Sequence, residues 1–105
     1  MCANILVTEW LPPDKGAEVA KLYPKIAQKP LKNLKRVGNS PYATTTEAGM
    51  KTVAIYEVED AKLADGIKEA LARRSPYMAI PGYRLQVEVI STMAEAIALV
   101  QPTAK

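Results

Sequence analysis

The stretch Lys51–Asp60 (KTVAIYEVED) carries the strongest strand pattern in the chain, because β-branched and aromatic residues dominate it and neither Gly nor Pro interrupts it. Apolar residues fall at both odd and even positions, which is typical of a strand with structure packed on both faces. We therefore predict a central strand of the only sheet, ended by Asp60.

Two further strands are predicted near the ends of the chain. Ala3–Leu11 (ANILVTEWL) is aliphatic and stops before Pro12, which cannot donate to a sheet ladder. Tyr83–Ile90 alternates apolar and polar positions, the pattern of a strand with one buried face. A fourth, weaker pattern covers Leu34–Thr46. Because it contains Gly and Pro, we predict a bulged edge strand that forms a hairpin with Lys51–Asp60.

Helical patterns follow the first and third strands. The first begins near Asp14, and Pro24 inside it predicts a kink or a division in two. Its apolar stripe consists of Val19, Leu22, Tyr23 and Ile26. The second begins at Asp60, and Arg73-Arg74 fits its C-terminal end, where positive charge is favoured. Its apolar face consists of Leu63, Ile67 and Leu71. A short third helix is predicted after the capping box Thr92–Glu95.

The order β-α-β-β-α-β plus a tail helix predicts an α+β fold, a single ferredoxin-like domain over residues 1–105. We expect a four-stranded antiparallel sheet with two helices on one face and an extra C-terminal helix. The first and third strands are expected to be central neighbours that run parallel. Odd-numbered strand residues should then face the helices: Ile5, Val7, Val53, Ile55, Leu85, Val87 and Val89. Truncating Ile55 to Ala should cost about 2–5 kcal/mol.

Even-numbered residues should line the opposite face, which then carries two large aromatic side chains, Trp10 and Tyr56. Left bare in a monomer, such a face would be an apolar patch in water. We therefore expect a homodimer that packs sheet to sheet, with Trp10, Tyr56 and Arg84 among its contacts. The alternative for the two aromatics is base stacking, as in RNA-recognition modules. The glycine-aromatic motif of those modules is absent, so no nucleic-acid partner is expected.

Composition narrows the chemistry. The chain has 105 residues and a net charge of +3, which is too small to argue for nucleic acid by itself. It has no His and a single cysteine, Cys2, which excludes His-based metal sites, Ser-His or Cys-His nucleophile pairs and an internal disulfide. We find neither a membrane span nor a signal peptide. We therefore expect a cytoplasmic protein with no metal, no cofactor and no membrane partner.

The element order, the aliphatic strands ANILVTEWL and KTVAIYEVED and the final strand YRLQVEVI together resemble the dimeric α/β-barrel superfamily. Its members are small ferredoxin-like chains that pair through their sheets. They include cofactor-free monooxygenases of antibiotic synthesis and stress-responsive barrel proteins. The resemblance implies a homodimer and a pocket between sheet and helices. Many characterised members use a His, which this chain lacks, so no catalytic residue is carried over.

Glu9 and Glu57 are the candidate catalytic residues. Each lies two residues beyond an aliphatic pair on the predicted core side, so parallel neighbouring strands would bring the two carboxylates together. Such a pair would share a proton or hold a cation, and would suit acid–base chemistry. The alternative is that both reach solvent at the sheet margin or pair with Lys or Arg.

A set of tyrosines, one methionine and one arginine is the candidate ligand-binding set. Tyrosine offers a pocket an apolar ring and a hydroxyl, and arginine can hold an anionic group by paired hydrogen bonds. The residues are Tyr23, Arg36, Tyr42, Tyr77, Met78 and Tyr83. The alternative is that they only fill core and rim. Arg84 could hold an anionic group in the same way, but it is equally suited to a contact with Glu88 across a dimer interface.

The leading functional hypothesis is a small soluble protein that binds a small, partly apolar molecule between sheet and helices, with cofactor-free chemistry as an extension. The alternative is a non-enzymatic assembly or regulatory module that acts through its dimer or oligomer surfaces. Its C-terminal helix would then dock on a neighbouring subunit. No motif in the sequence decides whether the protein is an enzyme.

Overall fold

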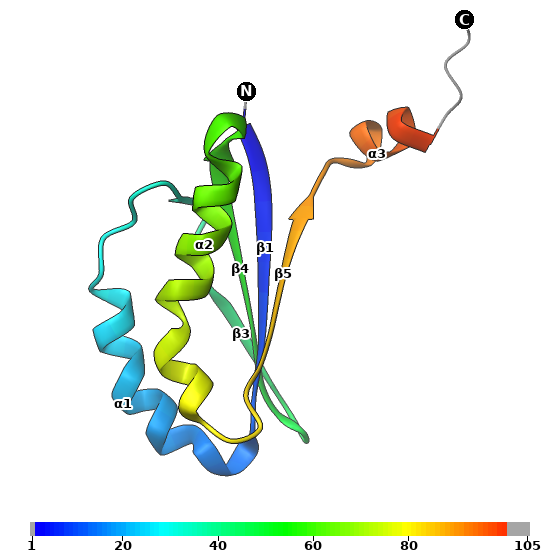
Figure 1. Cartoon of the computed structure of the whole chain (residues 1–105). Coiled ribbons are helices and arrows are strands. Elements are labelled where there is room, and N and C mark those ends of the chain that lie inside the picture. Colours follow the sequence, from blue (N-terminus) through cyan, green and yellow to red (C-terminus); the bar gives the residue numbers. More distant parts are fainter. Residues whose placement is uncertain (1, 101–105) are drawn as a thin grey trace, which may run out of the picture.

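The computed structural model describes residues 2–100, which form an α+β fold of one antiparallel sheet and three helices (Figure 1). In chain order the elements are β1 (Cys2–Leu11), α1 (Gly16–Ala27), β2 (Lys35–Arg36), β3 (Tyr42–Thr46), β4 (Gly49–Glu59), α2 (Leu63–Arg73), β5 (Arg84–Ile90) and α3 (Met93–Val100). Short 3-10 turns precede α1 and α2, and another connects α2 to β5. Every predicted helix and strand is present, with the edge strand in two pieces.

The sheet has five strands in the order β2-β4-β1-β5, and β3 pairs with β4 on the same edge as β2. β2 and β3 are therefore two halves of the predicted edge strand. The residues between them include Gly38, whose φ of +62° suits glycine, and Pro41, which has no N–H to donate. The hairpin from β3 to β4 turns at Glu47 and Ala48, between the paired residues Thr46 and Gly49.

β1 and β4 run antiparallel, which corrects the prediction of parallel neighbours. The crossover through α1 makes β1 parallel to the edge strand formed by β2 and β3. The tight hairpin then reverses the chain direction for β4, which inserts next to β1. The antiparallel pair has Ile5 opposite Tyr56 and Val7 opposite Ala54.

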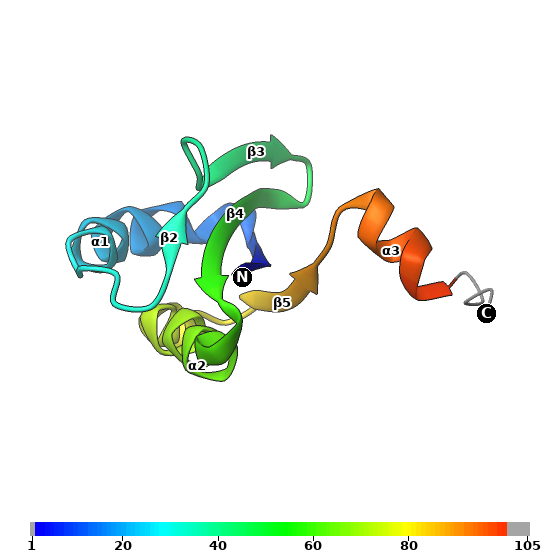
Figure 2. The same cartoon turned by 90° about the horizontal axis from the view of Figure 1, so that it is seen from above.

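α1 and α2 cover one face of the sheet, as predicted, and leave the other face bare (Figures 1 and 2). In β1 the odd-numbered side chains face the helices, and Ile5 and Val7 are fully buried. In β5 the same parity holds: Leu85 and Val87 pack against the core. Val89 lies on that side too, but it is 54 % exposed, so it is not the core residue that the pattern predicted.

In β4 the predicted parity is wrong. Tyr56 and Val58 are each 2 % exposed beneath the helices, because paired residues of antiparallel strands share a face and Tyr56 lies opposite Ile5. Val53 and Ile55 consequently lie on the bare face. β4 is apolar at both parities, so its alternation carries no information on which face the helices cover.

The core consists of two clusters of buried side chains. One lies under α2 and contains Ile5, Val7, Leu34, Ala54, Tyr56, Val58 and Ala70. The other lies near α1 and the turn before β5, and contains Leu11, Val19, Ile26, Tyr77 and Ile80. Gly66 lets α2 approach β4 closely, since a Cβ atom there would lie 2.9 Å from Val58 Cγ2.

The helices differ from their predictions in detail. α1 continues through Pro24 without division. The capping box before α3 is confirmed: Glu95 N donates to Thr92 Oγ1 (3.1 Å), and Thr92 N donates to a Glu95 carboxylate oxygen (2.7 Å). α3 extends away from the sheet, with Met93 76 % and Ile97 49 % exposed (Figure 1). No described helix is both long enough and apolar enough to cross a membrane.

Candidate functional site

Glu9 divides the helix-facing side of β1 into two apolar halves. Val7 before it and Leu11 after it belong to the two different core clusters, and Glu9 itself is only 5 % exposed. A buried carboxylate is strongly destabilising unless hydrogen bonds and an opposite charge compensate for its lost hydration. The residues around Glu9 are therefore the natural place to look for a site.

Three side chains from three segments surround the Glu9 carboxylate. Thr52, directly opposite on β4, donates its hydroxyl to Oε1 at 3.0 Å. Tyr83, just before β5, donates its hydroxyl to Oε2 at 2.5 Å. Arg74, at the C-terminal end of α2, places Nε 3.3 Å from Oε1. Both carboxylate oxygens are thus occupied, and the negative charge is paired with a buried guanidinium.

Arg74 is 4 % exposed, and it connects the carboxylate to a tyrosine of the core. One of its terminal nitrogens donates to the Tyr56 hydroxyl at 2.8 Å, and the guanidinium carbon lies 5.5 Å from the Tyr56 ring centre. Burial alone would lower the pKa of Arg74, but Tyr56 and Glu9 more than offset it and the pKa is raised. The guanidinium is therefore held charged beside Glu9. We call Glu9, Thr52, Tyr56, Arg74 and Tyr83 the ionic cluster.

Two tyrosines near Glu9, Tyr77 and Tyr83, have raised pKa values. Burial, together with the hydrogen bond to Glu9, raises the pKa of Tyr83. Burial, followed by the negative charge of Glu9, raises the pKa of Tyr77 to about 12. The two rings lie 5.6 Å apart, centre to centre, at an angle of 37°. Both hydroxyls therefore keep their protons at neutral pH, and that of Tyr83 donates to Glu9.

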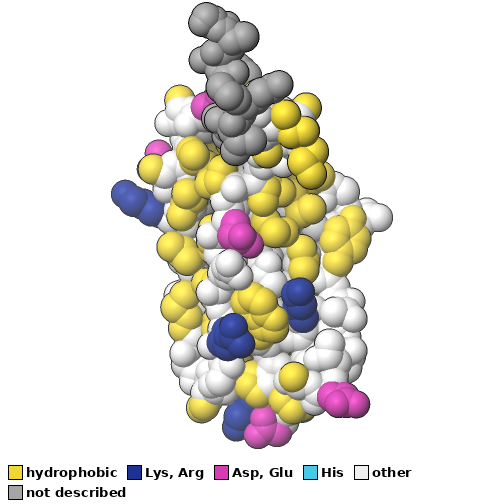
Figure 3. Space-filling model, turned by 90° about the vertical axis from the view of Figure 1, so that its right-hand side faces the viewer, with side chains coloured by type: hydrophobic (Ala, Val, Ile, Leu, Met, Phe, Trp, Pro, Cys, Tyr) yellow, Lys and Arg dark blue, Asp and Glu magenta, His cyan; other side chains and the backbone are white. Residues whose placement is uncertain are grey.

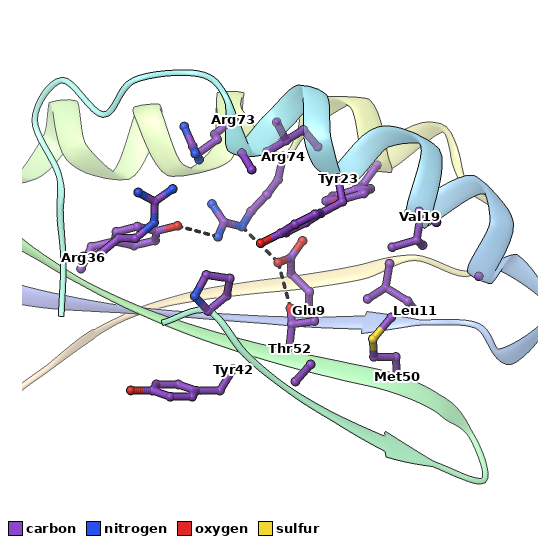
Figure 4. Close-up of a pocket in the computed structure, with 18 residues that line it drawn as sticks. Glu9, Leu11, Val19, Tyr23, Arg36, Tyr42, Met50, Thr52, Arg73 and Arg74 are labelled. Carbon is purple, nitrogen blue, oxygen red and sulfur yellow. Dashed lines mark hydrogen bonds and ion pairs between the residues drawn. The ribbon is translucent and has the colours of Figure 1, made fainter. Parts of the chain in front are cut away.

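A pocket of about 460 Å³ opens beside the ionic cluster, between the sheet and α1 (Figure 4). Its two ends differ in chemistry. Apolar side chains gather at one end: Leu11, Val19 and Met50 (Figure 4). Three arginines gather at the other: Arg36, Arg73 and Arg74. Glu9 and Tyr23 lie between the two ends. A volume of this size, mostly apolar with a few fixed polar groups, is typical of small-molecule sites.

Arg36 and Arg73 supply the positive charge that the ionic cluster does not neutralise. Arg73 Nη1 donates to the Lys29 carbonyl at 2.7 Å, which fixes its direction. Burial lowers the pKa of Arg73, and the nearby charges of Arg36 and Arg74 lower it further. Among residues 2–100, neither Arg36 nor Arg73 has a carboxylate oxygen within 4.0 Å.

The structure brings together four of the predicted ligand-binding residues, three of them with their side chains on the helix side of the sheet. Tyr23, Arg36 and Tyr77 line the pocket. Tyr42 borders it from β3, but its ring points to the other side of the sheet (Figure 4) and is 51 % exposed. Met78 does not line the pocket and is 52 % exposed.

Tyr83 contributes indirectly, through its bond to Glu9 in the ionic cluster. It is partly buried and packs against the core cluster near α1. Its predicted role as a lining residue is therefore replaced by a role in the floor beneath the pocket.

The predicted pair of Glu9 and Glu57 does not form. Because β1 and β4 are antiparallel, Glu9 lies opposite Thr52, whereas Glu57 lies opposite Asn4 at the far end of the strands. Glu57 also belongs to the bare-face parity of β4, next to Lys35 on β2. The shared-proton or cation site inferred from parallel strands is therefore excluded. In residues 2–100, no three acidic or cysteine side chains group so that they could hold a metal ion.

The alternative given for Glu9, pairing with Lys or Arg, is the one that the structure supports. The sequence did not identify Arg74, Thr52 or Tyr83 as its partners, although a signal was present. A Glu on the apolar face of a buried strand requires a cationic partner, and only a long basic side chain at the end of a packed helix could reach it. Arg73-Arg74 was predicted at the right position, the end of α2, but only as charge that suits a helix C-terminus. Both are buried, at 6 % and 4 % exposure.

Comparison with known proteins supports the fold alone. No protein-family model matches the chain, and no curated protein matches it. Among solved structures, the de novo designed protein Foldit4 is similar with a TM-score of 0.57 and 6 % identity, over 88 % of this chain and 99 % of that one. CPII, a nitrogen regulatory PII-like protein from Thiomonas intermedia K12 bound to ADP, AMP and bicarbonate, gives a TM-score of 0.37 and 16 % identity, over 88 % of this chain and 96 % of that one.

Proposed function

We propose that this protein binds a small, partly apolar molecule in the pocket between α1 and the sheet. The observation that carries the proposal is the pocket itself, a space of about 460 Å³ that closes on buried, fixed polar groups at its floor. Proteins rarely keep such a space beside a charged cluster without a use for it, because filling it with side chains would be more stable.

Binding is favoured over acid–base chemistry by the state of Glu9. A general base must come within hydrogen-bond reach of the substrate proton, and Glu9 is only 5 % exposed. Both oxygens of Glu9 already accept hydrogen bonds, and Arg74 pairs with one of them. The carboxylate is therefore suited to holding Arg74 in place. Cofactor-free chemistry remains the extension of the proposal, with the tyrosine hydroxyls as its donors.

Native mass spectrometry of the purified protein tests the proposal. We expect a mass difference between native and denatured spectra that corresponds to a retained small molecule. The Ala43→Trp variant should lose it, since Ala43 lines the pocket from the exposed strand β3. Thr44→Trp, one residue along on the bare face, is the matched control and should keep it. A native mass that equals the chain mass, with no small molecule bound in a ligand screen, would exclude the proposal.

The second candidate function is self-association through the bare face, in the manner of the dimeric α/β barrels. It is favoured by a band of apolar side chains across that face (Figure 3), formed by Leu6, Trp10, Val53, Ile55 and Ile90. Arg84 lies 4.8 Å from the Trp10 ring centre at one end, and Glu88 lies opposite Leu6 further along. A two-fold axis across the strands would bring Arg84 of one copy near Glu88 of another.

Tyr56 is not available to such an interface, because the antiparallel register places it beneath the helices. Of the predicted contact residues, Trp10 and Arg84 are still on the bare face. Val53 and Ile55 take the place of Tyr56 there. Size-exclusion chromatography with light scattering should show a dimer that Val53→Glu converts to a monomer. A monomer at all concentrations would remove this candidate.

A further inference from the structure

We infer that the pocket selects a small organic anion, one with an apolar body and a single acidic group that lies between Arg36 and Arg73. The inference rests on the proposed function and adds the class of ligand to it. Its basis is the separation of charge from apolar surface along the pocket, which Figure 4 shows with the arginines at one end and Val19, Leu11 and Met50 at the other.

The charges that line the pocket do not balance. Three arginines and one glutamate contribute, and the glutamate is already paired with Arg74. Two guanidinium groups, those of Arg36 and Arg73, remain without a carboxylate partner among the described residues. An arrangement of this kind favours a ligand that brings the missing negative charge.

The two free guanidinium groups converge from different elements. Arg36, on β2, is paired with Tyr56 on β4. Paired residues share a face, so the Arg36 side chain is on the helix side of the sheet. Arg73 reaches the same end of the pocket from α2 (Figure 4), and the positive charge of Arg36 contributes to lowering its pKa. Two like charges at this proximity repel each other. A carboxylate between them would relieve the repulsion and accept hydrogen bonds from both sides.

Glu69 is the acidic residue whose charge acts on Arg73 from its own helix, but it is already used. Its two carboxylate oxygens accept hydrogen bonds from the backbone N–H groups of Lys32 and Asn33, each at 2.7 Å. It thereby fixes the connection between α1 and β2 from outside the pocket. Its oxygens are more than 4.0 Å from Arg73, so it does not take the place of a ligand.

The apolar end sets the orientation of the ligand. Leu11 and Val19 are both less than 10 % exposed, and Met50 packs against the same cluster. An apolar body of about ten carbon atoms could bury most of its surface there, and that burial favours binding. The acidic group then reaches the arginine end, next to the ionic cluster.

A matched pair of probes tests the inference. Naphthalene-2-carboxylate and naphthalene-2-carboxamide share size and shape and differ in charge. Calorimetric titration of the full chain should give a Kd for the carboxylate about tenfold lower than for the amide, the gain expected of charge-assisted hydrogen bonds. Arg36→Gln should remove most of this preference, because it deletes one of the two guanidinium groups that would bind the carboxylate. Arg36 is exposed, so the substitution should leave the core intact. Lys35→Gln, its neighbour on the other face, should leave the preference unchanged.

The outcomes separate the two proposals. Equal affinity for the two probes, or a carboxylate preference that survives Arg36→Gln, would overturn the anion inference and leave the pocket as a binding site. Failure of both probes to bind, together with the absence of a retained ligand in native spectra, would overturn both. Binding of the carboxylate that Ala43→Trp does not reduce would place the probe outside the pocket and would also overturn the inference.

Discussion

Each face of the sheet carries a few side chains of the polarity that is expected on the other face. The face beneath the helices holds an ionised pair, Glu9 and Arg74, at 5 % and 4 % exposure. The face without helices carries Trp10, Val53 and Ile55 among its side chains. The difference shows that a buried position in this protein can hold a charge when an opposite charge and hydrogen bonds accompany it. Glu9 and Arg74 compensate for each other's buried charge, whereas the apolar side chains on the bare face are left partly in contact with water.

The largest effect is expected from Arg74→Met. The change removes the buried cation, and Glu9 is left in the core without a compensating charge. We expect the free energy of unfolding to fall by about 3–5 kcal/mol, the usual cost of removing one partner of a buried pair. Urea denaturation measures the loss.

Arg84→Met is the matched control on the bare face. The Arg84 guanidinium lies over the Trp10 ring and is exposed, so its loss should cost about 1 kcal/mol or less. Equal losses for the two arginine variants would show that the ionic cluster does not stabilise the fold.

A smaller contrast is expected for two isoleucines on opposite faces. Ile5→Ala should cost about 2–5 kcal/mol, because Ile5 is fully buried beneath α2. Ile55→Ala should cost only about 1 kcal/mol in a monomer, because Ile55 is partly exposed on the bare face.

Denaturation at two protein concentrations sharpens this comparison. If the bare face forms a dimer, the cost of Ile55→Ala rises with concentration, while that of Ile5→Ala relative to wild type does not. A loss at Ile55 equal to that at Ile5 in dilute solution would contradict the assignment of faces.

The smallest effect is expected at high pH. Tyr77 keeps its proton in the folded protein up to a pKa of about 12, whereas an unfolded tyrosine ionises near 10.0. Between these values the folded state binds more protons, so the free energy of unfolding falls as pH rises from 10.0 to about 12. Tyr77→Phe should show a shallower decline over this interval in urea denaturation, and one late-ionising tyrosine fewer in an ultraviolet titration. Identical slopes would contradict the raised pKa.

Much of the fold could be predicted from the sequence, because alternation and breakers are local signals. The strand at β5 alternates cleanly, and the gap in the edge strand follows from Gly38 and Pro41. β4 could not be oriented in the same way, since Tyr56 and Ile55 are both large and apolar. Its orientation depends on pairing with β1, which is a long-range property.

The candidate site was only partly predictable for the same reason. Tyr23, Arg36 and Tyr77 carry chemistry that suggests a pocket, and all three line it. The partners of Glu9 come from positions 43 to 74 residues away in the sequence, and no local pattern connects them. The error in β4 direction also placed Glu57 beside Glu9, so the acid–base hypothesis depended on a wrong register.

The interruption between β2 and β3 has a consequence for how the sheet can be extended. Val37 N and Ser40 Oγ both donate to the Ile55 carbonyl, at 2.9 and 3.1 Å, so the loop itself occupies this part of the β4 edge. Pro41 adds no donor. Among residues 2–100, β5 is thus the longest unbroken outer strand, and it offers the longest free edge to a chain that joins by strand addition.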